Sequence, residues 1–465
     1  MVSGPAPMNL PPIARVRRQF VQPEVDDAAA LVTRAIRTSH LAGRVLAGGR
    51  IAITVGSRGI AGLPRIVHAA AQAVRSLGFQ PFVVAAMGSH GGGTPEGQRA
   101  LLAELGVNES SAGCPVRCEM ETVVLGTNSF GLPIHFDQNA FDADGIILLN
   151  RIKPHTSFTG SYESGLLKML TIGLGKRQGA AQVHKLGLPG LKTMLPEVGA
   201  FLLERTPVAL GIAILENAFE HTARIVAVEP EELLEVEPRL LDQARELMGR
   251  LPFDQIDVLI VGELGKNYSG TGLDPNVIGR QRVETMPDLP RPVITRLAVL
   301  DLSVETRGNA LGIGLADLTT DRLVQAIDPV PMRVNSLTSN FLTRARVPLS
   351  LPTDRDVISA CLQTCWRIEP DQARLVFVPN TLELTTLWVT QPFAAEVEAH
   401  PELSFETDFR PMPLDAAGNL EQERLFPESV RGRRARPAGH RGNGPGAARP
   451  VVVEDRAAER VEYKW

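Results

Sequence analysis

The chain contains little cysteine and no long uninterrupted apolar run. Its 465 residues include four cysteines, too few for the disulfide framework of a small secreted protein. No run of about 18 uncharged apolar residues occurs, so we expect no transmembrane helix. The N-terminal segment MVSGPAPMNLPPIARVRRQF has no apolar stretch before a cleavage site, as a secretory signal would have. We therefore expect a cytoplasmic protein.

The chain also lacks a strong excess of either charge. Lys and Arg number 48, and Asp and Glu number 52, which gives a formal net charge of −4. This balance gives no reason to expect nucleic acid or an anionic membrane as a partner. The cysteine pairs Cys114/Cys118 and Cys361/Cys365 lack the C-x2-C spacing of zinc ribbons, so we do not expect a four-cysteine zinc site.

The length allows two or three domains, each with its own core. We predict a Pro-rich N-terminal arm over residues 1–25, which packs as an extended segment or stays loose. An N-terminal α/β domain over 26–252 follows, and a Pro-containing junction leads to a C-terminal α/β domain over 253–425. Residues 426–465 are rich in Arg, Gly and Pro and are predicted to form a disordered tail.

Two segments of the first domain repeat the order strand, glycine loop, helix. IAITVG (51–56) ends in Gly-Ser-Arg-Gly, and PFVVAAM (81–87) ends in GSHGGG. Thr94 and Pro95 then have the residue types of a helix N-cap and first helical position. This order is typical of a parallel α/β sheet.

Reactive side chains follow these strands. Arg58 and His90 lie in the two glycine loops, and His155 follows a third predicted strand, GIILLN (145–150). Ligands of parallel α/β sheets bind at the carboxyl ends of the strands. We therefore expect the three side chains to meet at one edge of the sheet.

The stretch from 150 to 187 is the strongest candidate for a site. It shows neither a helical nor a strand period, yet it holds many glycines, which let the backbone approach a ligand, a cofactor or another chain closely. These glycines are Gly160, Gly165, Gly173, Gly175 and Gly179. Lys168 is either a surface lysine or a partly buried reactive amine, and His184 on its own is equally compatible with a surface role.

With these residues in view, the chain resembles the nickel-dependent lactate racemase family over most of residues 45–330. The resemblance is carried by GSHGGGT (88–94) and by KPHTSFTGSYESGLLKM followed by VHKLG. Family members have a Gly-Thr-His loop, a Pro-His segment, a lysine, and a histidine sixteen residues after it. Here Lys168 and His184 reproduce that interval.

The resemblance implies two Rossmann-like α/β domains with the active site in the cleft between them. It implies an isomerase that inverts C2 of a 2-hydroxy acid through a 2-keto acid. Its cofactor would be a nickel-pincer nucleotide, pyridinium-3-thioamide-5-thiocarboxylic acid mononucleotide, joined to the Lys168 amine. His184 would be the nickel ligand, and Gly91, Gly92 and Gly165 would lie against the cofactor.

The same resemblance makes His90 and His155 the acid/base pair and Arg58 the clamp for the substrate carboxylate. Histidine suits the pair because its pKa lies near working pH, and arginine offers a planar, permanent charge. The interval from Pro-His to the lysine is longer here than in the lactate enzyme. The second domain reads GELGKNYSGTGLDPN in place of the family's substrate-binding Gln and Lys. We therefore expect Lys266 and Tyr268 to contact a larger 2-hydroxy acid or a sugar acid.

Other functions remain open from the residues alone. A cofactor-free hydrolase, lyase or binding protein on the same fold would use the histidines for a divalent metal. A phosphate or nucleotide binder would use the 88–94 loop at a helix N-terminus, although that loop lacks the lysine of a P-loop. The expected partners are the substrate and the enzymes that make the cofactor, and a homodimer is compatible with the sequence.

Overall fold

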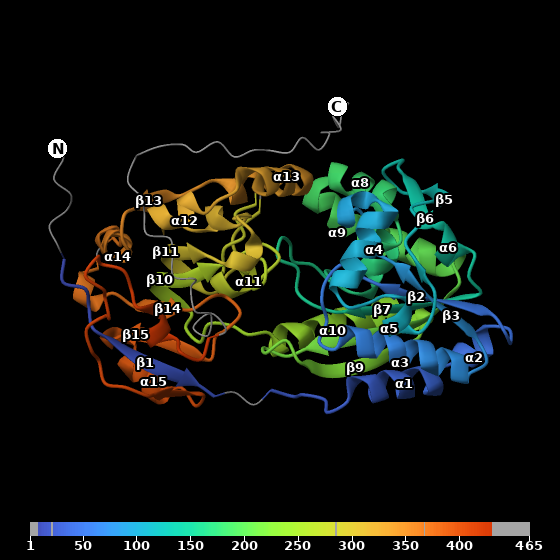
Figure 1. The fold of residues 1–465 in the computed structure, drawn as a ribbon, viewed down its shortest axis with the longest axis horizontal. Coiled ribbons are helices and arrows are strands. Elements are labelled where there is room, and N and C mark those ends of the chain that lie inside the picture. Colours follow the sequence, from blue (N-terminus) through green and yellow to red (C-terminus); the bar gives the residue numbers. More distant parts are fainter. Residues whose placement is uncertain (1–7, 20–21, 284–285, 367, 430–465) are drawn as a thin grey trace, which may run out of the picture.

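The computed structural model describes residues 8–19, 22–283, 286–366 and 368–429. The side chains of 184, 188, 189 and 338 also lie outside the description. The chain forms two α/β units, each built on its own sheet (Figure 1). The predicted α/β class is therefore confirmed. Within the described residues, no helix is both long and apolar enough to span a bilayer.

The first unit has a six-stranded sheet in the order β4-β3-β2-β7-β8-β9. All neighbours are parallel except the antiparallel pair β8–β9. The strands are β2 (Arg50–Val55), β3 (Gln80–Ala85), β4 (Val116–Arg117), β7 (Gly145–Arg151), β8 (Val208–Glu216) and β9 (Thr222–Val228). The strands predicted from 51, 81 and 145 onwards are confirmed, because buried parallel strands are short apolar runs bounded by turn residues.

Helices cover both faces of this sheet. Alternate residues of β2 separate the two cores: Ile51 and Ile53 pack on one side and Ala52 on the other. The first face carries α1 (Ala28–Thr38), α2 (Leu41–Arg44) and α3 (Leu63–Ser76). The other carries α7 (Leu166–Lys168), the π-helical turn η2 (Met169–Gly173), α9 (Gly187–Arg205) and α10 (Leu233–Leu247).

The remaining elements of the first unit follow β3 or lie between the strands in sequence. As predicted, Thr94 caps α4, accepting a hydrogen bond from Gly97 N–H with Pro95 in the first turn. These elements are α4 (Pro95–Glu104), α5 (Glu109–Ala112), the hairpin β5 (Thr122–Thr127) and β6 (Pro133–Asp137), α6 (Gln138–Phe141) and α8 (Lys176–Lys185).

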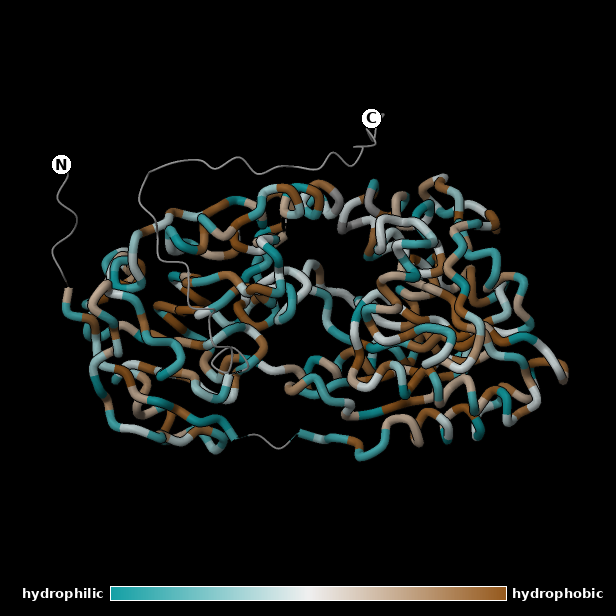
Figure 2. Tube along the Cα trace, in the orientation of Figure 1, coloured by the Kyte–Doolittle hydropathy of each residue, from teal (hydrophilic) through white to brown (hydrophobic). Residues whose placement is uncertain are grey.

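The second unit has an eight-stranded sheet in the order β13-β12-β11-β10-β14-β15-β1-β16. The five strands from β13 to β14 are parallel, and β15, β1 and β16 are antiparallel to their neighbours. Its strands are β10 (Gln255–Leu264), β11 (Val293–Leu302), β12 (Leu318–Thr320), β13 (Leu349–Leu351), β14 (Leu375–Val378), β15 (Thr386–Thr390) and β16 (Leu403–Phe405). Its helices include α11 (Pro275–Ile278), α12 (Asp321–Gln325), α13 (Pro329–Ser339), α14 (Asp354–Gln363), α15 (Ala394–Ala399) and α16 (Gln422–Leu425). Apolar residues gather along the central strands of both units (Figure 2).

The N-terminal arm is not loose but part of the second sheet. Its residues Ile13–Arg18 form β1, which pairs with β15 and β16. The chain then crosses to α1 in the first unit and returns to the second at β10 (Figure 1). The predicted disordered tail lies outside the described residues from 430 onwards.

Candidate active site

The carboxyl ends of β2, β3 and β7 lie side by side, because the three strands are parallel neighbours. The glycine-rich segment after Gly165 packs against these ends. A Cβ on residue 173 would lie 2.6 Å from the Ala86 carbonyl oxygen, and one on Gly56 would lie 3.2 Å from Met169 Cε. Several glycines of the stretch therefore let the chain approach its own strands closely.

Lys168 is the last residue of α7, directly before the π-helical turn. Its side chain is half-buried, and its Nζ lies 5.8 Å from the centroid of the Phe158 ring. Desolvation, with the positive charge of Arg58 as the next cause, lowers the pKa of the amine to about 8. A lysine in this state is partly neutral near physiological pH and can act as a nucleophile. These properties favour the reactive amine over the surface lysine.

The start of α7 is held by a buried carboxyl group on α10. Glu237, only 1% exposed, accepts a hydrogen bond of 2.9 Å from Leu167 N–H. A Cβ on residue 165 would lie 2.2 Å from Glu237 Oε1, so Gly165 is required for this contact. Burial raises the pKa of Glu237 to about 7. The close approach at Gly165 is thus made by Glu237.

His155 lies in the loop after β7 and is fixed on three sides. Its N–H donates to Glu163, and its carbonyl oxygen accepts from Asn276 Nδ2 at 3.3 Å. Its Nδ1 accepts from Ser157 N–H at 3.1 Å, so the neutral ring carries its proton on Nε2. Desolvation, followed by the charges of Lys168, Arg344 and Arg58, lowers the pKa of His155 well below its ordinary 6.5.

His90 has the opposite arrangement. Its Nδ1 lies 2.9 Å from the Met87 carbonyl oxygen, which can only accept, so Nδ1 carries the proton and Nε2 is the acceptor. Gln98 donates to Gly88 O at 2.9 Å and helps to hold this loop. A Cβ on Gly91 would meet the Gly97 backbone at 2.5 Å, whereas one on Gly92 would meet nothing within 4 Å. Gly92 is therefore the glycine of this loop that faces open space.

Arg58 and Lys266 come together from the two units. A Cβ on Gly270 would lie 3.2 Å from Arg58 Nη2, and Lys266 Nζ donates to Gly270 O at 3.2 Å and to Asn335 Oδ1 at 3.2 Å. Arg58 keeps contact with solvent, yet desolvation and the charge of Arg151 lower its pKa. Desolvation and Arg58 lower the pKa of Lys266 to about 8. Two cations thus face the space between the units.

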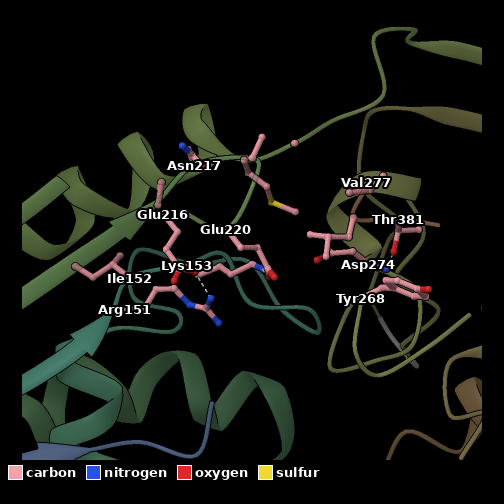
Figure 3. A pocket seen from close by; sticks show the side chains of 15 residues that line it. Arg151, Ile152, Lys153, Glu216, Asn217, Glu220, Tyr268, Asp274, Val277 and Thr381 are labelled. Carbon is pink, nitrogen blue, oxygen red and sulfur yellow. Dashed lines mark hydrogen bonds and ion pairs between the residues drawn. The ribbon is translucent and has the colours of Figure 1, made fainter. Parts of the chain in front are cut away.

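Tyr268 occupies a different position. It is buried, its hydroxyl donates to Glu263, and it lines a cavity between the units (Figure 3). The first unit lines this cavity with the ion pairs Arg151–Glu216 and Lys153–Glu220. Neither His155 nor Lys168 is among its lining residues. Tyr268 therefore lines a cavity that His155 and Lys168 do not line, and its hydroxyl is already hydrogen-bonded.

Two buried cations of the site were not found by sequence reasoning. Arg344 is 0% exposed and donates to Thr156 O and Ser157 Oγ, next to His155. Lys176, also 0% exposed, pairs with Asp137 at 2.8 Å and donates to Ala85 O at 2.8 Å. Lys176 thereby ties the glycine-rich segment to the end of β3. Lys176 lies within the 150–187 stretch but has no distinguishing pattern of its own, and Arg344 lies in no motif. Only the neighbours of each residue in the fold reveal its role.

The predicted nickel ligand lies on α8, but the side chain of His184 is outside the described residues. Among the side chains that the structure describes, no group of three or more His, Cys, Asp and Glu could hold a metal ion. A metal held mainly by an organic cofactor and one histidine does not need such a group.

Comparison with known protein families gives a match for most of the first unit. Residues 9–192 match the family described as the lactate racemase N-terminal domain. This part of the chain is therefore similar to that family. The matched range of the lactate racemase N-terminal domain contains Arg58, His90, His155, Lys168 and His184, whereas Lys266 and Tyr268 lie beyond it.

Two solved structures match much of the chain. One is the lactate racemase apoprotein from Thermoanaerobacterium thermosaccharolyticum, with 11% identity, a TM-score of 0.46, and coverage of 79% of this chain and 94% of that chain. Another is a protein from Thermotoga maritima, with 11% identity, a TM-score of 0.42, and coverage of 70% and 83%. No curated protein matches the chain in sequence.

Proposed function

We propose that the protein is a racemase or epimerase that inverts C2 of a 2-hydroxy acid through a 2-keto acid. The observation that carries the proposal is the half-buried Lys168 amine, with its pKa lowered to about 8, in a lactate racemase N-terminal domain. The charges of Arg58 and Lys168 act on His155 at the same strand ends. A nucleophilic amine, an imidazole and a cation are thereby combined in one place.

The substrate carboxylate binds to Arg58 and Lys266. These side chains approach Gly270 from opposite units. Desolvation lowers the pKa of each cation. An anion bound between them would be stabilised by both positive charges. Lys266 still has hydrogen bonds to Gly270 and Asn335 that hold its amine in place. We propose a larger 2-hydroxy acid or a sugar acid as the substrate.

His90 and His155 handle the hydroxyl proton. His90 can accept it at Nε2, because its Nδ1 proton is bound to Met87 O. His155 carries its proton at Nε2 and can donate a hydrogen bond to the oxygen on the other face. For the mirror-image substrate the two rings exchange these roles, which requires the contact between Ser157 N–H and His155 Nδ1 to open.

The residues present fit a lysine-tethered nickel-pincer nucleotide. The Lys168 amine has no ion-pair partner among the described residues and is partly neutral near pH 8, as acylation of an amine requires. Gly92 leaves open space beside the 88–94 loop. His184 would be the nickel ligand, since a neutral imidazole suits nickel. When bound, this group would supply the acceptor for the hydrogen on C2.

The decisive experiment is the intact mass of the protein produced together with nickel and the enzymes that make the pincer cofactor, followed by peptide mapping across 153–185. We expect an adduct on Lys168 and none in Lys168→Ala. The loaded protein, incubated with single enantiomers of 2-hydroxy acids and sugar acids, should form the opposite C2 configuration, and His90→Ala should lose this activity by roughly 100-fold or more.

An unmodified Lys168 after confirmed cofactor supply would reject the pincer enzyme. The protein would then be better explained as a cofactor-free divalent-metal hydrolase or lyase, or as a small-ligand binding protein on the same fold. Full activity of His90→Ala in both directions would reject the acid/base pair while leaving the cofactor assignment intact.

A further inference from the structure

Arg344 connects the second unit to the loop that carries His155. It lies in the short 3-10 helix η6 (Leu342–Ala345) and is 0% exposed. Its Nη1 donates to Ser157 Oγ at 3.0 Å and its Nη2 to Thr156 O at 2.9 Å, while its Nε donates to Gln281 O at 2.9 Å. Two of these three acceptors belong to the residues directly after His155.

Ser157 transmits this contact to the imidazole. Its hydroxyl accepts from Arg344, and its own N–H donates to His155 Nδ1 at 3.1 Å. A shift of Ser157 would therefore remove the hydrogen bond that selects the tautomer of His155. Asn276, also from the second unit, holds His155 O. Within the first unit, Glu163, which is paired with Arg245 at 2.6 Å, accepts from the backbone N–H of His155, and the centroid of the Phe158 ring lies 4.5 Å from that of the imidazole.

The charge of Arg344 acts in the same direction as its hydrogen bonds. The charged groups that face His155 are the cations Lys168, Arg344 and Arg58 and the carboxylate Glu163, which accepts from its backbone. After desolvation, the three cations disfavour the imidazolium form. If Nδ1 were protonated, the ring N–H and the Ser157 N–H would face each other as two donors without an acceptor. Arg344 thus opposes protonation by geometry and by charge.

We propose that Arg344 is a positioning residue that holds His155 as the neutral Nε2–H tautomer, and does so only while the two units are in contact. The proposal rests on the proposed function for its consequence in catalysis, but not for the state of the ring itself. A solely structural arginine would stabilise the interface without controlling which nitrogen of His155 carries the proton. The two roles can therefore be separated by experiment.

The test uses the full chain without cofactor, with isotope-labelled histidine and nuclear magnetic resonance. His155 is assigned from the signal that disappears in His155→Gln. In the unchanged protein we expect a neutral Nε2–H ring that does not titrate near 6.5. In Arg344→Met the midpoint of His155 should rise towards its ordinary value and both tautomers should appear. Arg346→Met removes an exposed arginine two residues away and should match the unchanged protein.

Two further variants keep the test decisive if Arg344→Met fails to fold. Arg344→Lys keeps the charge without the planar fork, and Ser157→Ala removes the hydroxyl that Arg344 binds but keeps the N–H. Both should show a mixture of tautomers with a smaller rise of the midpoint. An unchanged His155 signal in every folded variant would overturn the proposal.

With loaded enzyme and the enantiomer whose hydroxyl proton His90 accepts, Arg344→Lys should lower kcat by roughly tenfold or more with little change in KM, because orientation rather than substrate binding is lost. If kcat/KM fell by the same factor because KM rose while kcat stayed unchanged, Arg344 would contribute to substrate binding. That result would overturn the positioning role. A tautomer change without any Lys168 adduct would reject the proposed function and leave this inference standing.

Discussion

At the scale of the residue, Arg58 influences two lysines from different units. After desolvation, its positive charge is the next cause that lowers the pKa of both Lys168 and Lys266 to about 8. Like charges near one another favour the neutral amine, and a neutral amine is the reactive form. The site therefore activates Lys168 by means that belong to the protein alone.

We predict that Lys168 reacts faster than exposed lysines with a limiting amount of an amine-acylating reagent at pH 8. Its pKa of about 8 leaves roughly half of the amine neutral at this pH. The exposed Lys185 is the reference. Peptide mapping after brief labelling measures the ratio.

The matched variant is Arg58→Met. Loss of the positive charge should raise the pKa of Lys168 and slow its labelling, with no change at Lys185. Labelling of Lys168 no faster than that of Lys185 would show that its amine is not activated.

At the scale of the element, α10 holds the helix that carries Lys168. Glu237 caps the start of α7, and Tyr162 donates a 2.6 Å hydrogen bond to Leu234 O near the start of α10. Glu163 reaches the same helix through Arg245. Tyr162 and Glu163 thus attach the His155–Lys168 segment to α10.

Glu237 makes the stability of this arrangement depend on pH. Its pKa is raised from 4.5 to about 7 by burial. The native state therefore binds more protons than the unfolded state between these values, so the free energy of unfolding falls as pH rises from 4.5 through about 7. We predict that Glu237→Gln, which has no charge to bury, gains up to about 3 kcal/mol relative to the unchanged protein between pH 5 and pH 8.

Denaturant unfolding at the two pH values measures this difference. Glu235→Gln, on the exposed face of the same helix, should follow the unchanged protein at both. An equal pH dependence for Glu237→Gln and the unchanged protein would show that Glu237 is already ionised at pH 5.

The elements themselves were largely predictable from sequence. β2, β3 and β7 are short apolar runs between turn residues, and Thr94-Pro95 starts α4 by its capping chemistry. The reason for the glycines was harder to infer. Gly165 and Gly173 looked like contacts for a ligand, but they accommodate Glu237 and the Ala86 carbonyl. A glycine indicates close approach without identifying the group that approaches.

At the scale of the whole molecule, the two units share the chain in an order that sequence does not reveal. β1 has the sequence IARVRR, whose three arginines are typical of a solvated arm. In the fold these arginines pair with Glu402, Glu406 and Glu428, which lie between 384 and 411 residues away in sequence. No local pattern predicts partners at that separation. Arg344 was not found from sequence because its hydrogen-bond partners Thr156 and Ser157 are also far away in the chain and belong to the other unit.

The position of β1 makes the second unit depend on the N-terminus. Val16 is 0% exposed and pairs with Leu387 of β15 and Phe405 of β16. We predict that Val16→Asp lowers the free energy of unfolding of the second unit by about 3 kcal/mol, because it buries an unpaired charge. Val124→Asp, at a residue that is 54% exposed on β5, should have little effect.

The buried cysteines report each unit separately, since Cys114 and Cys118 lie in the first core and Cys361 and Cys365 in the second. Thiol labelling at low denaturant, read by peptide mapping, should rise at Cys361 and Cys365 in Val16→Asp while Cys114 and Cys118 stay protected. If all four thiols became accessible together, the result would show that the two units unfold as one cooperative structure. The crossings of the chain and the contacts of Arg344 would then be what couples them. Exposure of Cys361 and Cys365 alone would mean that the second unit can unfold by itself. The His155 loop would then lose its hydrogen bonds to Arg344 while the Lys168 segment stays folded.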